Sequence, residues 1–286
     1  MKRAVVLAHF DRDGIVDPYV IAAVRAYRPL ADTLVLVSAS AGRLPDALRG
    51  SVDAFLPRDN VGYDFGSWQA GVRWLGEPRR FDEILFVNDS AYGPLFDLGP
   101  ALEHPSGQTA DLWGMVMSSE RGAHVQSWCF TMRRPILEST AFASFWKSVV
   151  PQPSKEDVVN RYEVGMSRFF EAAGVRVGAL VDGRHEPPPT IRETLHAAAG
   201  LGPAGLWRHV RQLRRRGPPY NPSELFWRRL WNAGVPYLKA GILRRNQYAI
   251  DPRRVLADVS RLNPEWGALI TAHQARLAVS PPPTSG

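Results

Sequence analysis

The stretch "ILFVNDSAYGP", residues 84–94, decides how the rest of the chain is interpreted. An apolar run stops abruptly at Asn88, Asp89 and Ser90, and a turn with Gly93 follows. A short apolar run bounded by turn residues predicts a buried strand. In open α/β sheets, ligands bind beyond the carboxyl ends of the parallel strands. The polar triplet therefore marks a candidate site.

Strand and helix patterns alternate before this stretch. Residues 4–10 (AVVLAHF) and 33–40 (TLVLVSAS) are typical of strands, and residues 17–27 are typical of a helix with Asp17 as N-cap and Pro18 in its first turn. Short apolar strands separated by helices predict the α/β class with a mostly parallel, doubly wound central sheet.

The pattern continues less regularly after residue 110. Residues 111–117, 127–134 and 175–182 are predicted strands. Residues 154–174 predict one long helix, opened by a capping box of Ser154 and Asp157. We expect a core over 1–182, a helical basic extension over 183–263 packed on that core, and a C-terminal segment over 264–286 that ends in a disordered tail, "PPPTSG".

Composition limits the classes of function. The 35 Lys+Arg residues exceed the 28 Asp+Glu residues and give a net charge of +7, which suggests nucleic acid, anionic lipid or a phosphorylated substrate as partner. Nucleic acid is the least favoured of these, because no recognition motif accompanies the basic residues. The single cysteine, Cys129, excludes an internal disulfide and a multi-thiolate zinc site, and its apolar neighbours predict a buried thiol.

No apolar stretch is long enough for a membrane-spanning helix. The first apolar run is broken by His9 and Asp11, and no signal-peptide cleavage site follows it. We expect a cytoplasmic protein, with peripheral binding to the inner face of the cell membrane as an addition to that location.

A series of motifs resembles the rhamnan synthesis protein F family of bacterial polysaccharide glycosyltransferases. In order along the chain they are "RDNVGYDFGSWQAG", "FVNDSAYGP", "DLWGMVMSSERGAHVQSWCF", "FWK", "YEVGMSRFFEAAG" and "NPSELFW". The resemblance implies a GT-A fold and a nucleotide-diphosphate-sugar donor such as dTDP-rhamnose. It also implies transfer of rhamnose or another deoxyhexose, with inversion at the anomeric carbon, to a cell-surface polysaccharide such as O-antigen or to a lipid-linked glycan.

Asn88-Asp89-Ser90 occupies the place where GT-A enzymes carry an Asp-x-Asp motif, with Asn88 in place of the first acid. A diphosphate leaving group needs its negative charge neutralised, commonly by a divalent ion held by oxygen ligands. Asp89 is therefore the predicted ligand of Mg²⁺ or Mn²⁺. The alternative interpretation is a turn after a strand, for which these residue types are common.

Further donor-binding candidates lie at other strand ends and in the loop before residue 63. They are His9, Asp11, Ser38, Arg58, Asn60, Gly62 and Asp64. Gly62 permits close backbone approach, and the polar side chains can bind base, ribose or phosphates. The competing interpretation of the loop is a helix entry capped by Asp64.

Glu163 is the predicted catalytic base. Glu163 and Ser167 share a helix face, and the resemblance places this helix where inverting GT-A enzymes carry the acid that accepts the acceptor's proton. The alternative is a solvated Glu paired with an arginine. Asp111 is a second catalytic candidate, expected with Trp113 beside the metal site. The acceptor-side candidates are Trp113, His124, Gln126 and Ser127.

Residues 206–231 form the most basic part of the chain. Leu206, Val210 and Leu213 recur at helical spacing among arginines, next to Trp207. Three interpretations remain open: a peripheral anchor on anionic lipid, a diphosphate clamp, or a core-packing helix with a solvated arginine face. For the whole chain, the main rival to an enzyme is a catalytically inactive GT-A-like module that binds glycans or acts as a scaffold.

Overall fold

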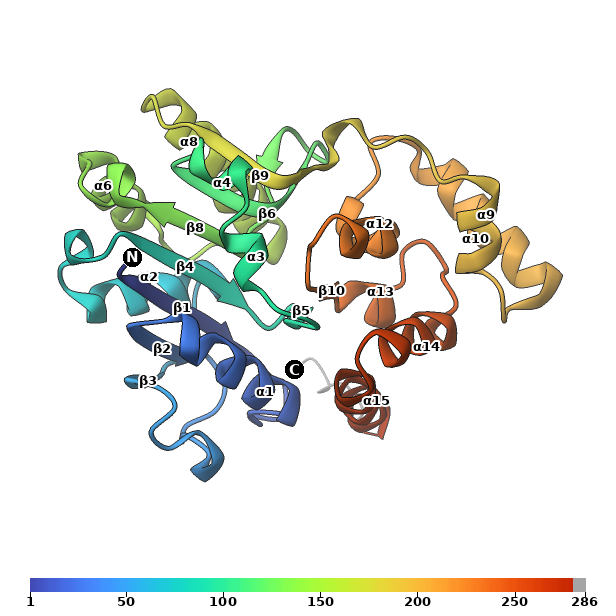
Figure 1. The fold of residues 1–286 in the computed structure, drawn as a ribbon, viewed down its shortest axis with the longest axis horizontal. Coiled ribbons are helices and arrows are strands. Elements are labelled where there is room, and N and C mark those ends of the chain that lie inside the picture. The colour runs from blue at the N-terminus through green and yellow to red at the C-terminus, as the bar shows by residue number, and fades with distance from the viewer. Residues whose placement is uncertain (280–286) are drawn as a thin grey trace.

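The computed structural model describes residues 1–279 and consists of a central sheet, helices on both its faces, and a C-terminal helical region at one end (Figure 1). The predicted disordered tail, 281–286, lies outside the described residues.

The main sheet has the strand order β3-β2-β1-β4-β8-β6-β7, and β9 pairs with β6. Its strands are β1 Arg3–His9, β2 Thr33–Ser38, β3 Ala54–Pro57, β4 Glu83–Asn88, β6 Leu112–Ser118, β7 His124–Val125, β8 Cys129–Arg133 and β9 Val177–Asp182. Strands β1, β2, β3 and β4 are mutually parallel, β6 is parallel to β9, and β8 runs antiparallel to both β4 and β6. This mostly parallel sheet with helices on both faces confirms the predicted α/β class.

A second, two-stranded sheet joins distant parts of the chain. In it β5 Ala91–Tyr92 pairs antiparallel with β10 Leu238–Lys239, so that Lys239 lies opposite Ala91. The carbonyl of Ser90 also accepts a hydrogen bond from the backbone N–H of Ala240 at 2.9 Å. The segment directly after β4 is thus held against the C-terminal region.

The helices fall into two groups, one before and one after residue 183. Before residue 183 they are α1 Pro18–Tyr27, α2 Tyr63–Leu75, α3 Gly99–Leu102, α4 Pro105–Gln108, α5 Arg134–Leu137, α6 Thr140–Ser148, α7 Lys155–Val158 and α8 Gly165–Ala172, with short 3₁₀ turns at Arg28–Leu30, Asp46–Leu48 and Pro78–Arg80. After a 3₁₀ turn at Gly183–His185 they are α9 Ile191–Ala197, α10 Gly202–Arg216, α11 Pro222–Leu225, α12 Trp227–Asn232, α13 Gly241–Arg244, α14 Pro252–Leu262 and α15 Pro264–Val279.

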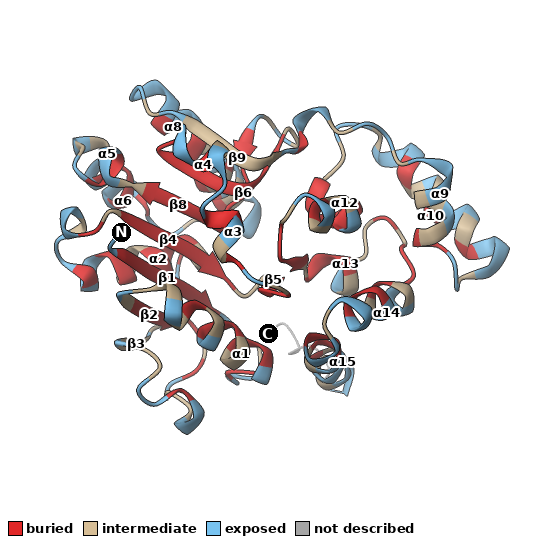
Figure 2. Cartoon of the chain, viewed as in Figure 1, coloured by how far each residue is buried: buried red, intermediate tan, exposed pale blue. Residues whose placement is uncertain are grey.

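The strands of the sheet are largely buried (Figure 2), and because side chains alternate between its two faces they contribute to a core on each face. In β1, Val5 and Leu7 pack with α1 and the C-terminal helices, whereas Val6 packs with α2 and α6 on the other face. Helix α2 approaches closely because Gly71 has no side chain: a Cβ there would collide with Val6. Buried area on both faces excludes water from the strands and leaves their carboxyl ends as the polar edge.

Two local predictions need correction. The expected single helix over 154–174 is interrupted by a π-helical segment, Val159–Val164. In this segment the Tyr162 hydroxyl bonds the backbone at Ser148 and Val150, which fixes the wider turn against α6. Asp17 occupies the N-cap position of α1, but its carboxylate accepts from Arg276 at 2.9 Å instead of capping the helix.

Candidate active site

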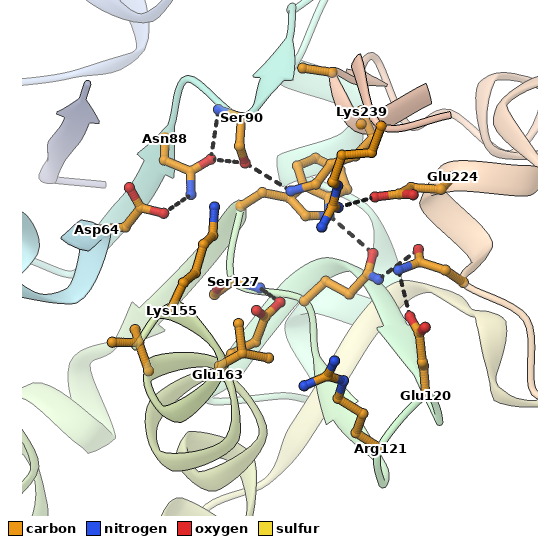
Figure 3. A pocket seen from close by; sticks show the side chains of 18 of the residues that line it. Asp64, Asn88, Ser90, Glu120, Arg121, Ser127, Lys155, Glu163, Glu224 and Lys239 are labelled. Carbon is orange, nitrogen blue, oxygen red and sulfur yellow. Dashed lines mark hydrogen bonds and ion pairs between the residues drawn. The ribbon is translucent and has the colours of Figure 1, made fainter. Parts of the chain in front are cut away.

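A cleft of about 720 Å³ opens where the carboxyl end of β4 meets the C-terminal region (Figure 3). One wall comes from α2, the 120–128 segment and the 155–163 segment, and the other comes from residues 216–247. The predicted candidates that line it are Asp64, Asn88, Ser90, His124, Gln126, Ser127 and Glu163. The structure therefore brings together residues from strand ends and helices that lie far apart in sequence.

The motif after β4 is tied up by its own hydrogen bonds. Asn88 Oδ1 accepts from the Ser90 backbone N–H at 3.1 Å and from the Ser90 hydroxyl at 2.6 Å. Asn88 Nδ2 donates to Asp64 Oδ2 at 2.9 Å. This amide thus links the start of α2 to the turn after β4, which accounts for an Asn at the position where an acid was expected.

Asp89 turns away from the cleft toward β1. Its Oδ2 accepts from the Phe10 backbone N–H at 2.9 Å and lies 4.0 Å from His9 Nε2. Burial, reinforced by the nearby Asp64 carboxylate, raises the pKa of Asp89 to about 7. Burial also raises the pKa of Asp64. Two carboxylates therefore flank Asn88 in surroundings that favour a cation or a proton.

Lys239 supplies positive charge at the motif. Its ammonium donates to Ser90 Oγ at 2.8 Å and lies 5.9 Å from the centre of the Trp128 ring. Burial lowers the pKa of Lys239 to about 8, while the carboxylates of Glu163, Glu224 and Asp64 act in the opposite direction. Lys239 was not a sequence candidate.

Glu163 lies in the cleft on the π-helical segment. Its Oε1 accepts from the Ser127 backbone N–H at 3.1 Å, and the side chain is half-buried. One turn later, Ser167 Oγ accepts from the Val125 backbone N–H at 3.0 Å. Both side chains face β7 and the start of β8, as the shared helix face predicts, and Glu163 points its carboxylate into the cleft (Figure 3).

The 124–127 segment connects the sheet to the "NPSELFW" motif. Gln126 Oε1 accepts from Trp128 Nε1 at 3.1 Å and from the Ser223 hydroxyl, and Gln126 Nε2 donates to Asn221 Oδ1 at 3.1 Å. His124 Nδ1 lies 2.7 Å from the Gly122 carbonyl oxygen. The contacts of Gln126 thus join two motifs in the folded protein that lie 95 positions apart in the sequence.

Asp111 and Trp113 are not beside the cleft, which corrects two predictions. Asp111 precedes β6 and bonds Arg176 at the amino edge of the sheet, with Oδ1 accepting from Nη2 at 2.7 Å. Trp113 is fully buried, and its Nε1 donates to Ser106 Oγ at 3.2 Å. The cleft lies at the carboxyl edge, and residues that begin a parallel strand lie at the other edge.

The candidates at or just after the ends of β1 and β2, His9, Asp11 and Ser38, do not line the cleft. His9 Nδ1 is 2.9 Å from Ser38 Oγ, both side chains are buried, and burial lowers the pKa of His9 to about 4. Asp11 is paired with Arg276 of α15, which lowers its pKa against the effect of burial. These groups join strand ends to each other and to α15.

The loop before α2 is held by Arg58. Arg58 Nη1 donates to Ser67 Oγ at 3.0 Å, and Nη2 donates to the Val61 carbonyl. Gly62 is the N-cap of α2 with a φ of +82°, a left-handed conformation that favours glycine, and Asn60 is exposed. Asp64 does not cap α2 but bonds Asn88, so the capping interpretation is replaced by a strand-to-helix link.

The side chains present do not fit a divalent ion at Asn88-Asp89-Ser90. Asn88 Oδ1 and Ser90 Oγ are engaged with each other, and an ammonium already lies on Ser90. Within residues 1–279 there is no group of three or more His, Cys, Asp or Glu residues placed to hold a metal. A divalent ion there would have to displace Lys239 or rearrange the turn.

Several cleft residues were missed because they are brought in from the C-terminal region. They include Arg216, Glu224, Lys239, Arg244 and Arg245, together with Lys155 of α7. Two patterns gave a signal: the arginine-rich stretch 206–216, of which Arg216 lines the cleft, and the "NPSELFW" motif, which contains Glu224. The two-residue strand that carries Lys239 is too short to be detected by periodicity.

Two proteins with known sequences are similar to this chain over part of their length. Relatives include virulence protein VirA of Vibrio anguillarum, 27% identical over 220 residues that cover 74% of this chain and 70% of VirA. Uncharacterized protein y4gN of Sinorhizobium fredii is 22% identical over 130 residues, 44% of this chain and 34% of that protein.

Solved structures show more distant likenesses. Glucosyl-3-phosphoglycerate synthase from Mycobacterium tuberculosis, in complex with Mn²⁺, UDP and phosphoglyceric acid, gives a TM-score of 0.42 at 14% identity, covering 77% of this chain and 80% of that one. Galactosyltransferase LgtC gives 0.35 at 14% identity, covering 62% and 72%. Scores this low transfer neither residues nor ligands. The family model for rhamnan synthesis protein F matches residues 34–199, more than half of the chain, and the chain belongs to that family.

Proposed function

We propose that this protein is a glycosyltransferase that moves a sugar from a nucleotide-diphosphate donor to a hydroxyl of a glycan. Family membership and the cleft at the carboxyl edge of the sheet support the proposal. Rhamnose or another deoxyhexose is the proposed sugar, dTDP-rhamnose the first donor to test, and a cell-surface polysaccharide or lipid-linked glycan the proposed acceptor.

The observation that carries this proposal is that Glu163 and a group of cations line opposite walls of one cleft. Glu163 is fixed by the Ser127 N–H on one wall, and the Lys239 ammonium lies at Ser90 on the other (Figure 3). A carboxylate suited to accept a proton therefore faces a region suited to bind phosphate.

The proposed reaction is direct displacement with inversion at the anomeric carbon. The acceptor oxygen forms a bond to that carbon as the bond to the diphosphate oxygen breaks, and the diphosphate leaves with the electron pair. Glu163 accepts the proton of the attacking hydroxyl, which prevents positive charge from building up on oxygen. A well-placed base of this kind typically contributes about 10²–10⁴-fold in rate.

Asp89 as a ligand of Mg²⁺ or Mn²⁺ stays a prediction. Its carboxylate adjoins the cleft residue Asn88, but it points toward Phe10 and His9. If Asp89 holds a metal-bound diphosphate, Asp89→Asn will weaken nucleotide-diphosphate binding only when metal is present. No step of the reaction above depends on such an ion.

Glu163→Gln tests the assignment of the base. The variant keeps the shape of the side chain, so it is expected to fold and bind donor like the wild type while kcat for transfer falls by about 10²–10⁴-fold. Asp111→Asn is the matched control, because its carboxylate lies at the other edge of the sheet, and it is expected to retain transfer.

The assay follows release of nucleoside diphosphate from a panel of nucleotide-sugars that includes dTDP-rhamnose, with NMR to establish the anomeric configuration of the product. Near-normal transfer by Glu163→Gln, or retention of configuration, would overturn the assignment. Donor binding without transfer or hydrolysis by the wild type would favour the alternative, a catalytically inactive GT-A-like glycan-binding or scaffolding module.

We also propose a membrane-facing role for α9 and α10. These helices lie at the end of the molecule farthest from β3 (Figure 1). Ile191 is 81% exposed, Leu195 51% and Trp207 62%, beside the exposed arginines of α10. Exposed apolar side chains among arginines suit an anionic lipid surface, where a lipid-linked acceptor would be found. No helix within residues 1–279 has the length and apolarity needed to cross a bilayer.

For domain organisation we propose the division expected from sequence: a catalytic core over 1–182, an extension over 183–263, and a C-terminal segment from 264. Cleft residues on both sides of position 182 support treating the core and extension as one functional unit.

A further inference from the structure

The sequence predicts a divalent ion at Asn88-Asp89-Ser90, but the structure places the ammonium of Lys239 at this motif. Ser90, the third residue of the motif after β4, accepts a hydrogen bond from the Lys239 ammonium at 2.8 Å. The ammonium belongs to β10, which is paired with β5 directly after Ser90. Backbone pairing therefore fixes Lys239 at the motif, because Lys239 lies opposite Ala91 in the antiparallel register.

Among the described residues, no carboxylate forms a direct ion pair with the Lys239 ammonium. Burial lowers the pKa of Lys239 to about 8, while Glu163 of the π-helical segment, Glu224 of α11 and Asp64 of α2 favour the charged form and Lys155 of α7 opposes it. The ammonium donates a hydrogen bond to a neutral hydroxyl, Ser90 Oγ. An ammonium has three donors, so donors remain for a ligand in the cleft.

Glu224 organises a second cation beside Lys239. Its side chain is 1% exposed, and Oε1 accepts from Arg245 Nη2 at 2.5 Å. Oε1 packs against Gly241, where a Cβ would collide with it, so the backbone after Lys239 follows the Glu224 carboxylate closely. Arg245 is 70% exposed on the cleft side, and Arg244 also lines the cleft. The extension thus presents Lys239, Arg244 and Arg245 together.

We propose that Lys239, with Arg244 and Arg245 beside it, binds the diphosphate of the donor and neutralises the leaving group in place of a divalent ion. The inference rests on the proposed function and adds the residues that perform one of its steps. As the bond from the anomeric carbon to the diphosphate oxygen breaks, the electron pair and its negative charge go to that oxygen. Charge-assisted hydrogen bonds from the ammonium stabilise it, which is the task commonly given to a metal.

The test is calorimetric binding of UDP, dTDP, GDP and CDP to the full chain in EDTA, and then in Mg²⁺ or Mn²⁺. The wild type is expected to bind at least one of these diphosphates in EDTA. Lys239→Met is expected to weaken that binding by about 10- to 100-fold, the range for loss of a hydrogen bond to a charged group. Lys239→Arg is expected to recover most of the loss.

Two controls separate phosphate binding from general damage. Lys147→Met removes an exposed lysine of α6 and is expected to leave binding unchanged. The nucleoside of the tightest-binding diphosphate is expected to bind wild type and Lys239→Met equally, since it has no phosphate. Circular dichroism checks the fold, and Lys239→Gln replaces Lys239→Met if the latter is unfolded.

The outcomes distinguish this inference from the proposed function. Diphosphate binding that requires Mg²⁺ or Mn²⁺ and is unchanged in Lys239→Met overturns the inference and leaves the glycosyltransferase proposal standing. Equal loss of nucleoside and diphosphate affinity in Lys239→Met also overturns it, because it shows a structural role. Failure of the wild type to bind any of the four diphosphates, with or without metal, overturns the proposed function itself.

Discussion

The part of the cleft built by residues 1–182 and the part built by residues 183–279 differ in the sign of their charges. Among the described residues that line the cleft, the first part contributes the acids Asp64, Glu120, Glu156 and Glu163 against the cations Arg121 and Lys155. The second part contributes the cations Arg216, Lys239, Arg244 and Arg245 against the acid Glu224. Acids gather on the sheet side and cations on the extension side.

This difference divides the proposed chemistry between the two parts. A proton acceptor must keep a free carboxylate, and Glu163 does so because a backbone N–H from Ser127 holds it without an ion pair to an arginine in the described contacts. A diphosphate site needs cations with donors left for phosphate: Lys239 has no direct carboxylate partner among the described residues, whereas Arg245 shares its guanidinium with Glu224. Placing the two sets on separate segments keeps them from pairing with each other, so the extension is expected to be required for donor binding.

The largest expected effect is a loss of folding stability in Arg276→Met, because Arg276 joins the two parts of the chain. Its guanidinium bonds Asp11, Asp13 and Asp17, and Asp11 and Asp17 are buried. Arg276→Met leaves those carboxylates close together without their cation, and removing one partner from a buried ion pair costs about 3–5 kcal/mol. Because Arg276 is 22% exposed, we expect about 3 kcal/mol.

Urea unfolding measures the Arg276→Met effect as a lower midpoint. Arg253→Met provides the comparison, since Arg253 is 85% exposed and 4.0 Å from Asp251, and a surface pair contributes about 0–1 kcal/mol. Equal midpoints for the two variants would show that α15 is not held to the core through this cluster.

A smaller, pH-dependent effect is expected at Asp89. Burial and Asp64 raise its pKa in the folded protein to about 7, above the value of about 4 in an unfolded chain. Between these two values the folded state binds more protons than the unfolded state, so this group lowers stability as pH rises from about 4 to 7. Asp89→Asn removes the effect and is expected to be similar to wild type at pH 4 and more stable at pH 8. The full shift corresponds to about 4 kcal/mol, and because the Asp89 side chain is 11% exposed to solvent we expect on the order of 2 kcal/mol.

Urea unfolding at pH 4, 6 and 8 checks the Asp89 prediction, with the exposed Asp59→Asn as control. A constant difference between Asp89→Asn and wild type across this range contradicts it. Repeating the series in Mg²⁺ sharpens the comparison of the two cleft walls: stabilisation of wild type but not of Asp89→Asn would place the ion at Asp89 and weaken the case for Lys239.

The sheet and its carboxyl edge were predictable because each depends on local patterns. Apolar runs and turn residues located the strands, and Asn88, Ser90 and Glu163 follow or face strand ends in the cleft. The buried, free Cys129 was also predicted correctly. Asp111 was expected beside the metal site, which is the wrong edge of the sheet. That expectation followed from the family resemblance and did not take into account that Asp111 precedes its strand.

The extension side of the site was not predictable from local patterns. Lys239 reaches Ser90 through a two-residue strand pair with a sequence separation of 149 positions. The sequence indicated the arginine-rich helix α10 but left its three interpretations open. In the structure Leu213 is buried, Trp207 is exposed and Arg216 lines the cleft. One helix therefore shows features of all three interpretations at different positions.

The smallest expected effect concerns membrane binding by α10. Trp207 is 62% exposed, and Arg211 lies over its ring with 4.8 Å between guanidinium carbon and ring centre. An indole among arginines partitions into the interface of an anionic bilayer, and the charges add attraction that salt screens within about 10 Å at 0.1 M. We expect cosedimentation with phosphatidylglycerol vesicles at low salt to fall severalfold in Trp207→Ala and as salt rises, whereas Trp74→Ala, at a 43% exposed tryptophan of α2, binds like wild type. Equal loss in both variants, or equal binding to neutral phosphatidylcholine vesicles, would contradict a lipid-facing α10. The extension would then supply cations to the cleft without also bringing the cleft to a membrane.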